Sequence, residues 1–411
     1  MDRVVITGMG TVNPLGLTVA ETWQKVTAGV SGVGPITLFD SSGLGVHFAA
    51  EVKHFDPATY MDAKEARRRD RVQQMGVAAA KEALAESGLQ ITDETAGRIA
   101  TVVGSGGGGI RTFQDAVVLV HQEGARRISP FMIPMFMPNG TAGVIAMDYG
   151  LLGPCFSLAS ACATGLDAIG VAWLMLKAGM VDAAVAGAAE GCVSEIVLAA
   201  FDRVGALSRR NDDYSMAPQP FDKNRDGLVV GEGAAVVVLE REDAARKRGA
   251  SILAELAGYG AAADAYHVTA PHPAGRGSAA AMSAALNAAR AAPDDVDYIS
   301  AHGTGTSLND AAETRAIKTA LGDKARRVAI SSTKSMTAHM MGSTGALETI
   351  FCVLAIRDGI LPPTIHYETP DPDCDLDYVP NAAREQRVDL ALNNAFGFGG
   401  HNSVIAVRRY A

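Results

Sequence analysis

The chain has 411 residues, of which 48% are hydrophobic and 20% are charged, so it is long enough and apolar enough to bury a large core. Its 36 basic and 45 acidic residues give a formal net charge of -9, which gives no support to a general attraction to nucleic acid or to an anionic membrane. No stretch resembles a secretory signal, and none reaches the roughly 18 uncharged apolar residues of a membrane span. We therefore expect a cytoplasmic protein with no membrane and no nucleic-acid partner.

Short apolar runs alternate with longer amphipathic stretches along the chain. Runs typical of buried strands lie at residues 3–10, 98–106, 183–191 and 233–240, and a helical pattern covers residues 71–88. The second half restarts the pattern at 251–260, 296–303, 327–335 and 402–410. Buried strands that alternate with helices indicate an α/β fold.

A glycine run, "VVGSGGGGI" at residues 102–110, matches the G-x-G-x-x-G pattern of dinucleotide-binding loops. Such a loop needs a second strand that ends in Asp or Glu about 20 residues further on, to hold the ribose. Here the following helix leads into a basic loop, and Glu123 lies before that loop and not at the end of a strand. We therefore interpret the glycines as sites of close backbone approach and reject the nucleotide site.

Two stretches resemble each other across the chain. Residues 163–179 and 343–359 share a Thr-Gly step near the start, a leucine and a final glycine, at the same spacing. Two unrelated amphipathic helices can match in this way by chance. A duplicated α/β unit explains the match better, because each stretch follows an apolar strand.

Cys162 is the candidate nucleophile. It lies where an apolar run turns sharply into a helix at small residues, which exposes a side chain beside the helix N-terminus. A thiol with a pKa of ~8.5 is only about 3% ionised at neutral pH, so a histidine partner is needed. The five cysteines form no CxxC pair, which indicates reduced thiols, and Cys155, Cys192 and Cys352 are expected to be small buried hydrophobic residues.

Two histidines are expected to reach Cys162. His302 and His339 each follow an apolar strand and enter a loop of small residues, and Lys334 precedes His339 in the same loop. A cysteine can hold an acyl group as a thioester, while two Nε2–H donors stabilise an enolate formed by decarboxylation of a malonyl thioester. A cysteine hydrolase would instead need one histidine and an orienting Asn or Asp. The histidines lack HxxxH or HxxC spacing, so no metal site is expected.

Four motifs in this order resemble the β-ketoacyl-acyl carrier protein synthases, most closely the type II elongating enzymes: "ACATG" at Cys162, "AHGTGT" at His302, "SSTKSMTAHMMGSTGALE" at Lys334, and "NAFGFGGHN" near the end. The resemblance covers nearly the whole chain. It implies a thiolase fold, in which two duplicated halves, residues 1–250 and 251–411, form a five-layer αβαβα sandwich. It also implies a dimer and no cofactor of its own, because the acyl carrier protein brings the phosphopantetheine.

The resemblance assigns roles to the reactive residues. Cys162 would carry the acyl group, His302 and His339 would promote malonyl decarboxylation and condensation, and Lys334 would orient the site. Glu313 would be the charge partner of Lys334. Asp310 would be a further supporting carboxylate, and without the resemblance both carboxylates fit a helix cap and a solvated face.

The same resemblance implies how substrates are held. The backbone N–H groups of Cys162 and Phe398 would form the oxyanion hole, with Phe398 also gating the pocket, and Thr304 and Thr306 would bind the phosphopantetheine arm. An acidic carrier protein needs a basic docking patch, and the candidates are Lys64, Arg67, Arg68, Arg126 and Arg127. Gly205 stands where many family members have an arginine, so docking is expected to differ in detail.

Gly107 replaces the bulky residue that closes the acyl pocket in many elongating synthases, which predicts space for longer or stiffer acyl chains. The expected product is a 3-oxoacyl carrier protein two carbons longer, as in fatty-acid elongation. The alternative is the ketosynthase subunit of a type II polyketide synthase, which "GLDAIG" at residues 165–170 resembles. The first implies a homodimer and the second a heterodimer with a chain-length subunit. A thiolase would need a second cysteine near the C-terminus, and a non-catalytic subunit would lack Cys162.

Overall fold

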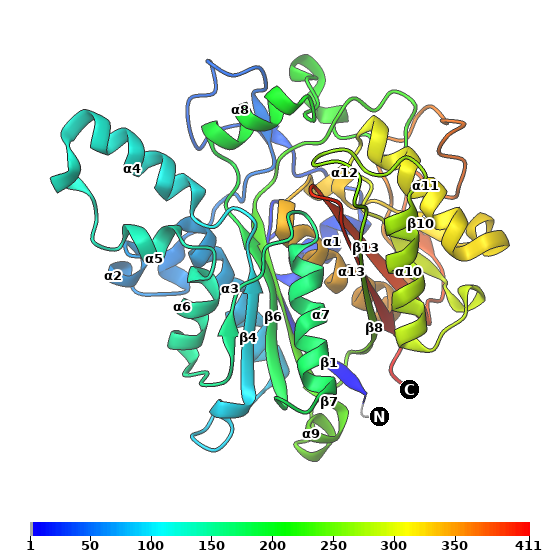
Figure 1. Ribbon diagram of the computed structural model, residues 1–411, viewed down its shortest axis with the longest axis horizontal. Coiled ribbons are helices and arrows are strands. Elements are labelled where there is room, and N and C mark those ends of the chain that lie inside the picture. Colours follow the sequence, from blue (N-terminus) through cyan, green and yellow to red (C-terminus); the bar gives the residue numbers. More distant parts are fainter. Residues whose placement is uncertain (1–2) are drawn as a thin grey trace.

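A ten-stranded mixed sheet forms the centre of the computed structural model, which describes residues 3–411 (Figure 1). In the described chain its order is β10-β9-β13-β14-β8-β1-β7-β6-β4-β5. The first half supplies β1 (Val4–Val12), β4 (Ile99–Gly104), β5 (Cys155–Phe156), β6 (Ala183–Glu190) and β7 (Gly233–Arg241). The second half supplies β8 (Ala254–Ala263), β9 (Tyr298–Ser300), β10 (Ala329–Ser331), β13 (Leu390–Gly397) and β14 (His401–Arg408). The sequence runs predicted eight of these strands, and they missed β5 and β13.

The two halves of the sheet have the same topology. When the five strands of each half are numbered in chain order, both halves run 3-2-4-5-1. In both, the second strand is parallel to the third and fourth, whereas the fifth is antiparallel to the fourth and the first. The halves meet where β1 pairs with β8. This agreement confirms the duplication predicted from the repeated stretches.

Helices cover both faces of each half-sheet, so three layers of helices alternate with the two half-sheets and give five layers in all. The outer helices are α3 (Arg71–Ser87) and α6 (Gly140–Tyr149) on one side and α10 (Arg276–Ala289) and α11 (Ser307–Leu321) on the other. The helices α7 (Thr164–Lys177) and α13 (Thr344–Asp358) lie between the two half-sheets and are the two members of the repeat. Separate apolar clusters fill the central layer and the two outer layers. The predicted αβαβα sandwich is therefore confirmed.

The remaining elements connect or decorate this core. They are the helices α1 (Val19–Thr27), α2 (Ala63–Ala66), α4 (Ile110–Glu123), α5 (Met132–Phe136), α8 (Glu195–Val204), α9 (Glu242–Lys247) and α12 (Lys334–Thr337), and the short strand pairs β2 (Gly34–Pro35) with β3 (Phe48–Ala49) and β11 (Ile360–Leu361) with β12 (Arg384–Glu385). Among the described helices, none combines the length and the apolar character needed to cross a membrane.

Helix α3 shows how sequence signals set the packing. Asp70 caps its first turn, and Gly88 ends it in the left-handed conformation at φ 61°. Gly8 and Gly10 of β1 let the helix approach the sheet, because a β-carbon at these positions would lie 2.1 Å from Ala83 O and 2.0 Å from Ala79 O. The helix therefore packs backbone against backbone on β1.

Candidate active site

Cys162 lies at the turn that leads into α7, at the carboxyl end of the first half-sheet. The residue before it, Ala161, has a φ of 51°, in the left-handed region that a residue with a β-carbon occupies at a cost of about 1–3 kcal/mol. Gly165 allows α7 to start close to the second repeat, since a β-carbon there would lie 2.7 Å from Gly342 O. This strained turn directs the thiol into a pocket beside the helix N-terminus.

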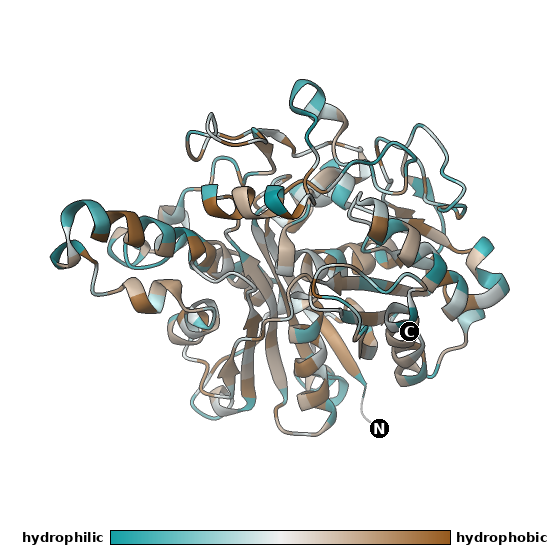
Figure 2. Cartoon of the chain, turned by 45° about the horizontal axis from the view of Figure 1, so that its top comes forward, coloured by the Kyte–Doolittle hydropathy of each residue, from teal (hydrophilic) through white to brown (hydrophobic). Residues whose placement is uncertain are grey.

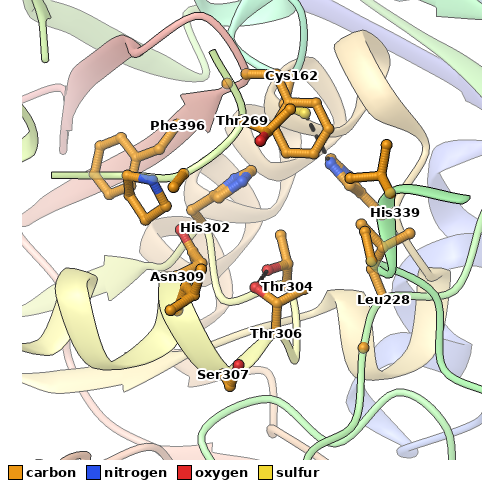
Figure 3. A pocket seen from close by; sticks show the side chains of 18 of the residues that line it. Cys162, Leu228, Thr269, His302, Thr304, Thr306, Ser307, Asn309, His339 and Phe396 are labelled. Carbon is orange, nitrogen blue, oxygen red and sulfur yellow. Dashed lines mark hydrogen bonds between the residues drawn. The ribbon is translucent and has the colours of Figure 1, made fainter. Parts of the chain in front are cut away.

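Both predicted histidines meet Cys162 from the second half of the chain (Figure 3). His302 follows β9, and His339 follows α12 after Ala338, which is also left-handed at φ 56°. His339 Nε2 lies 3.0 Å from Cys162 Sγ, and one ligand-type atom from each of the three residues lies within 4.8 Å of the others. The two imidazole rings stand edge to face with centroids 5.4 Å apart. A small molecule at the sulfur would therefore contact both rings.

Burial holds the three reactive groups neutral, and one nearby cation adds to this effect at the two histidines only. Burial raises the pKa of the Cys162 thiol to about 11, although the Lys334 charge and the N–H groups of Phe398 and Cys162 act in the opposite direction. Burial and Lys334 lower the pKa of His339 to about 3, and burial, Lys334 and His339 hold the pKa of His302 well below its ordinary value. At neutral pH the site therefore holds a thiol and two imidazoles that can each donate one N–H.

Two backbone N–H groups adjoin the sulfur, as the oxyanion hole requires. Both the Phe398 and the Cys162 amides stabilise a charge on Cys162 Sγ by hydrogen bonding. Gly397 allows this approach, since a β-carbon there would lie 3.0 Å from Cys162 N. The Phe398 ring packs against Phe201 with centroids 5.9 Å apart, at the wall of the pocket. The arrangement can stabilise a negative oxygen on a carbon bonded to the sulfur.

A cavity of about 230 Å³ leads from the surface to Cys162. Thr304 and Thr306 both line it, and their hydroxyl oxygens lie 2.9 Å apart (Figure 3). Val204 and Leu308 line it too, and both side chains are largely exposed. A flexible arm can therefore enter past Val204 and Leu308 and run along the two hydroxyls to the thiol.

Glu313 was expected to pair with Lys334, and this prediction is wrong. Lys334 Nζ lies 2.7 Å from Glu348 Oε1 and 3.4 Å from Ala301 O. Glu313 instead accepts hydrogen bonds from the backbone N–H groups of His302 at 2.8 Å and Gly303 at 2.7 Å. The reason is the layer order, because Lys334 meets α13 of the central layer, whereas Glu313 lies on the outer helix α11. A clue was present in the sequence: Glu348 is the only charged residue between positions 340 and 356.

Asp310 supports the loop that carries Thr304 and Thr306. It is fully buried and accepts hydrogen bonds from Phe221 N at 2.8 Å and from Gly305 N at 3.3 Å. Arg225 Nε lies 3.8 Å from its carboxylate. Asp310 thus orders the wall of the pocket without facing the sulfur.

The glycine run binds a carboxylate of the chain itself. Glu190, at the end of β6, accepts hydrogen bonds from Gly106 N at 2.6 Å, Gly107 N at 3.2 Å and Ser105 Oγ at 3.1 Å. It also accepts from Gly342 N at 3.2 Å, in the loop that follows His339. Glu190 is fully buried, and sequence reasoning did not single it out. The backbone N–H groups of the glycine run therefore do bind an anion, as such loops can. The anion is the Glu190 carboxylate, which links the run to the loop that follows His339.

Gly107 does not line the cavity at Cys162. A β-carbon there would meet Cys192 Sγ at 3.4 Å and Glu190 Oε2 at 3.5 Å, which are ordinary contacts. The neighbouring Gly108 is different, because it has a φ of 55° and its β-carbon would lie 2.6 Å from Phe136 O. The backbone therefore requires glycine at 108 but not at 107.

The basic residues predicted for docking lie on two exposed segments. Lys64 and Arg67 are exposed at α2, where Arg68 stacks its guanidinium 4.7 Å from the centre of the Phe131 ring. Arg126 and Arg127 are exposed in the turn after α4. None of the five lines the cavity, whereas the exposed Arg203 directly precedes Val204 at its wall.

Two further expectations concern cysteines and metals. Cys192 and Cys352 are buried as expected, but Cys155 is exposed because β5 is the edge strand of the sheet. Within the described chain, Cys162, His302 and His339 are close enough together to hold a metal ion, but the site uses these side chains otherwise. Four of the buried side-chain oxygens that lack a hydrogen-bond partner within residues 3–411 belong to Ser300, Glu348, Asn393 and Asn394, and oxygen is the ligand type that a hard cation prefers.

The fold and the site define an acyltransferase that has a thiolase fold and a cysteine beside two histidines. Models of the β-ketoacyl synthase N-terminal and C-terminal domains match residues 1–245 and 253–368. A 3-oxoacyl-[acyl-carrier-protein] synthase 2 from Staphylococcus aureus is 45% identical over 408 residues, which are 99% of this chain and 98% of that protein. The protein of the same name from Synechocystis sp. shows the same identity and coverage.

Solved structures agree with these matches. The ishigamide ketosynthase/chain length factor superposes with a TM-score of 0.94 at 36% identity, over the full length of both chains. A β-ketoacyl synthase from Burkholderia phymatum gives 0.93 at 34%, and a type II polyketide ketosynthase in complex with its acyl-carrier protein gives 0.92 at 33%, both also over full length. This chain belongs to the β-ketoacyl synthase family, which confirms the resemblance, the fold and the condensing activity predicted from the motifs.

Proposed function

We propose that this chain extends an acyl group held as a thioester on Cys162 by two carbons from a malonyl group, with both groups delivered by acyl carrier protein, in fatty-acid elongation. The observation that carries the proposal is the convergence of Cys162 Sγ, His302 and His339 within 4.8 Å at the end of a cavity. The carrier protein is supported by the names of the full-length relatives.

Acyl transfer comes first. Cys162 Sγ attacks the thioester carbonyl, and its proton passes to His339 Nε2, 3.0 Å away. The negative oxygen accepts hydrogen bonds from the N–H groups of Cys162 and Phe398. The bond to the pantetheine sulfur then breaks, and the leaving thiolate takes the proton from His339.

Condensation follows. The α-carbon to carboxylate bond of the malonyl thioester breaks, CO₂ leaves, and His302 and His339 donate N–H groups to the enolate oxygen. Because His339 Nδ1 lies 3.3 Å from the Thr344 hydroxyl, which can donate or accept, both neutral tautomers of this histidine are supported. The enolate carbon attacks the acyl carbonyl, and the Cys162 thiolate is expelled and regains a proton from water. Overall one proton is consumed per CO₂ released.

The carrier protein would approach the cavity mouth and insert its phosphopantetheine along Thr304 and Thr306. Arg203 beside the mouth offers a cation that takes the place of the arginine missing at Gly205. The patches at Lys64 and Arg126 lie away from this mouth on the same chain, and a dimer would let them serve the partner's site. The acidic surface of a carrier protein fits each of these patches.

The chain would act as a dimer through α4. Within residues 3–411 this 14-residue helix has no buried side chain. Four of its apolar side chains are each at least 40% exposed: Phe113, Val117, Val118 and Val120. Figure 2 shows the apolar segments of this arm, which projects from the body of the molecule. Exposed apolar side chains gathered on one helix in this way are typical of a surface that contacts another protein chain.

A polyketide ketosynthase is the second candidate. Two observations favour it: structures of polyketide ketosynthases superpose over the whole chain at 33% and 36% identity, and Gly107 lacks a side chain that its surroundings would accept. In that case the partner would be a homologous chain-length subunit. Purification of the chain from its own cells separates the candidates, because a homodimer supports elongation and a heterodimer supports polyketide synthesis.

The proposal is tested by mixing the purified protein with acyl-carrier protein and malonyl-carrier protein and measuring intact masses. We expect an acyl adduct on the enzyme with acyl donor alone and a 3-oxoacyl carrier protein when both are present. The variant Cys162→Ala should show neither. Product formation by this variant would overturn the proposal.

A further inference from the structure

Asp167 joins four segments around the nucleophile. It lies in the first turn of α7, and its carboxylate accepts hydrogen bonds from three hydroxyl groups. Ser160 Oγ donates to one oxygen, and Tyr259 OH, at 2.8 Å, and Ser403 Oγ donate to the other. Ser160 precedes the active-site turn, Tyr259 lies on β8, and Ser403 lies on β14. Three hydroxyl donors need an acceptor with several lone pairs and no proton, which describes a carboxylate.

Two of these hydroxyls belong to the segments that carry the oxyanion hole. Ser160 is two residues before Cys162, and Ser403 is five residues after Phe398. The two segments also touch directly, since a β-carbon at Gly397 would lie 2.8 Å from Ser160 O. The two halves of the hole therefore come from opposite halves of the duplicated fold, and Asp167 hydrogen-bonds to both segments.

Tyr259, on β8, holds the Asp167 carboxylate in place from the side of the sheet. Its ring lies against α7 at Gly170, where a β-carbon would meet Tyr259 Cδ2 at 2.3 Å. Gly170 thus provides the room for the ring, and the ring sets where its hydroxyl meets Asp167. Neither Asp167 nor Tyr259 lines the cavity at Cys162, so neither contacts the reacting atoms.

We propose that Asp167 is a positioning residue that fixes the distance between the Cys162 and Phe398 N–H groups. The inference rests on the proposed function, because it assigns those N–H groups to the oxyanion hole. That hole serves attack on the acyl thioester, whereas His302 and His339 serve malonyl decarboxylation. Loss of Asp167 should therefore slow acylation of Cys162 and leave decarboxylation largely intact.

The experiment measures these two half-reactions separately in the full-length enzyme. Acylation is followed as the rate of the Cys162 adduct from acyl-carrier protein, and decarboxylation as CO₂ release from malonyl-carrier protein without an acyl donor. The variants are Asp167→Ala, which removes all three bonds, and Ser403→Ala, which removes one. Thr7→Val is the matched control, because Thr7 Oγ1 donates to the buried Glu240 carboxylate at 2.6 Å on β1, a strand that contributes no residue to the cavity.

We expect acylation to fall about 10- to 100-fold in Asp167→Ala and less in Ser403→Ala, since small displacements of catalytic donors have effects of this size. Decarboxylation should stay within about twofold in both, and Asp167→Asn, which keeps one acceptor oxygen, should recover part of the acylation rate. Equal losses in both half-reactions, or unchanged acylation in folded Ser403→Ala, would overturn the inference. If the unsubstituted enzyme forms no adduct, the proposed function fails instead.

Discussion

Lys334 and Glu348 form an ion pair in which Nζ lies 2.7 Å from Oε1 and both side chains are at most 1% exposed. The pair joins the loop that carries His339 to α13 of the central layer. Removal of one partner leaves an uncompensated buried charge, which typically costs about 3–5 kcal/mol. Lys334 therefore has two effects. Its charge lowers the pKa of both histidines, and its ion pair with Glu348 stabilises the fold.

The ion pair can be tested by a double-mutant cycle. We expect Glu348→Leu and Lys334→Met each to lower the free energy of unfolding by about 3–5 kcal/mol, and the double variant Lys334→Met/Glu348→Leu to recover much of this loss. Urea unfolding provides the measurement. Glu313→Gln should show no coupling to Lys334→Met, and strong coupling there would contradict the pairing.

The rate of malonyl decarboxylation at low pH should depend on Lys334. The pKa of His339 is about 3, so in the unsubstituted enzyme this imidazole stays neutral as the pH falls to about 5. In Lys334→Met the cation that lowers this pKa is gone, so the pKa rises and protonation begins at a higher pH. Burial still holds this pKa below its ordinary value of 6.5, so malonyl decarboxylation should decline only at the acid end, between about pH 6.5 and about pH 5, and in the variant only. Parallel profiles for both enzymes would show that Lys334 has no such effect.

Cys162 should react as a thiol of high pKa. Because its pKa is about 11, the rate of alkylation by iodoacetamide should rise about tenfold per pH unit between about pH 7 and about pH 10. Lys334 lowers this pKa, so Lys334→Met should alkylate more slowly at each pH. Mass spectrometry of the modified peptide measures both rates. A plateau near neutral pH would mean that a substantial thiolate fraction is already present there.

A side chain at Gly107 should shorten the accepted acyl chain. The position accepts a β-carbon, with its nearest contact at 3.4 Å, so Gly107→Ala should fold normally and Gly107→Ile should fill space beside Cys192. We expect Gly107→Ile to prefer acyl donors shorter by a few methylene groups, measured by competition between carrier-bound chains. Unchanged preference would mean that position 107, which does not line the cavity at Cys162, has no influence on the length of the acyl chain. Gly108→Ala is the contrasting variant, because its positive φ predicts loss of stability.

Helix α4 should mediate self-association. Val118→Asp places a charge on its exposed apolar surface and should yield monomers in sedimentation analysis, because a buried unpaired carboxylate is unfavourable in an interface. Val30→Asp, at another exposed valine, is the control and should leave the assembly unchanged. An unchanged assembly in Val118→Asp would place the interface elsewhere.

The sequence by itself determined the fold and predicted the three side chains that meet at the end of the cavity. Apolar runs located eight core strands, and the repeat at 163–179 and 343–359 predicted the duplication that the identical strand orders confirm. These signals are local, because burial of a strand or a helix start leaves its pattern in consecutive residues. Cys162, His302 and His339 could be found for the same reason, since each stands in a stretch of small residues that follows an apolar run.

Tertiary structure decided which groups are partners. Glu313 and Glu348 both stand on helices that follow one of the two histidines, and the layer order decides that Glu348 faces Lys334. The glycine run likewise has an anion to bind, and only the parallel pairing of β4 with β6 brings Glu190 to it. Charge pairing and hydrogen bonding act over a few ångströms in space, and positions far apart in the chain reach that distance only when the layers have packed.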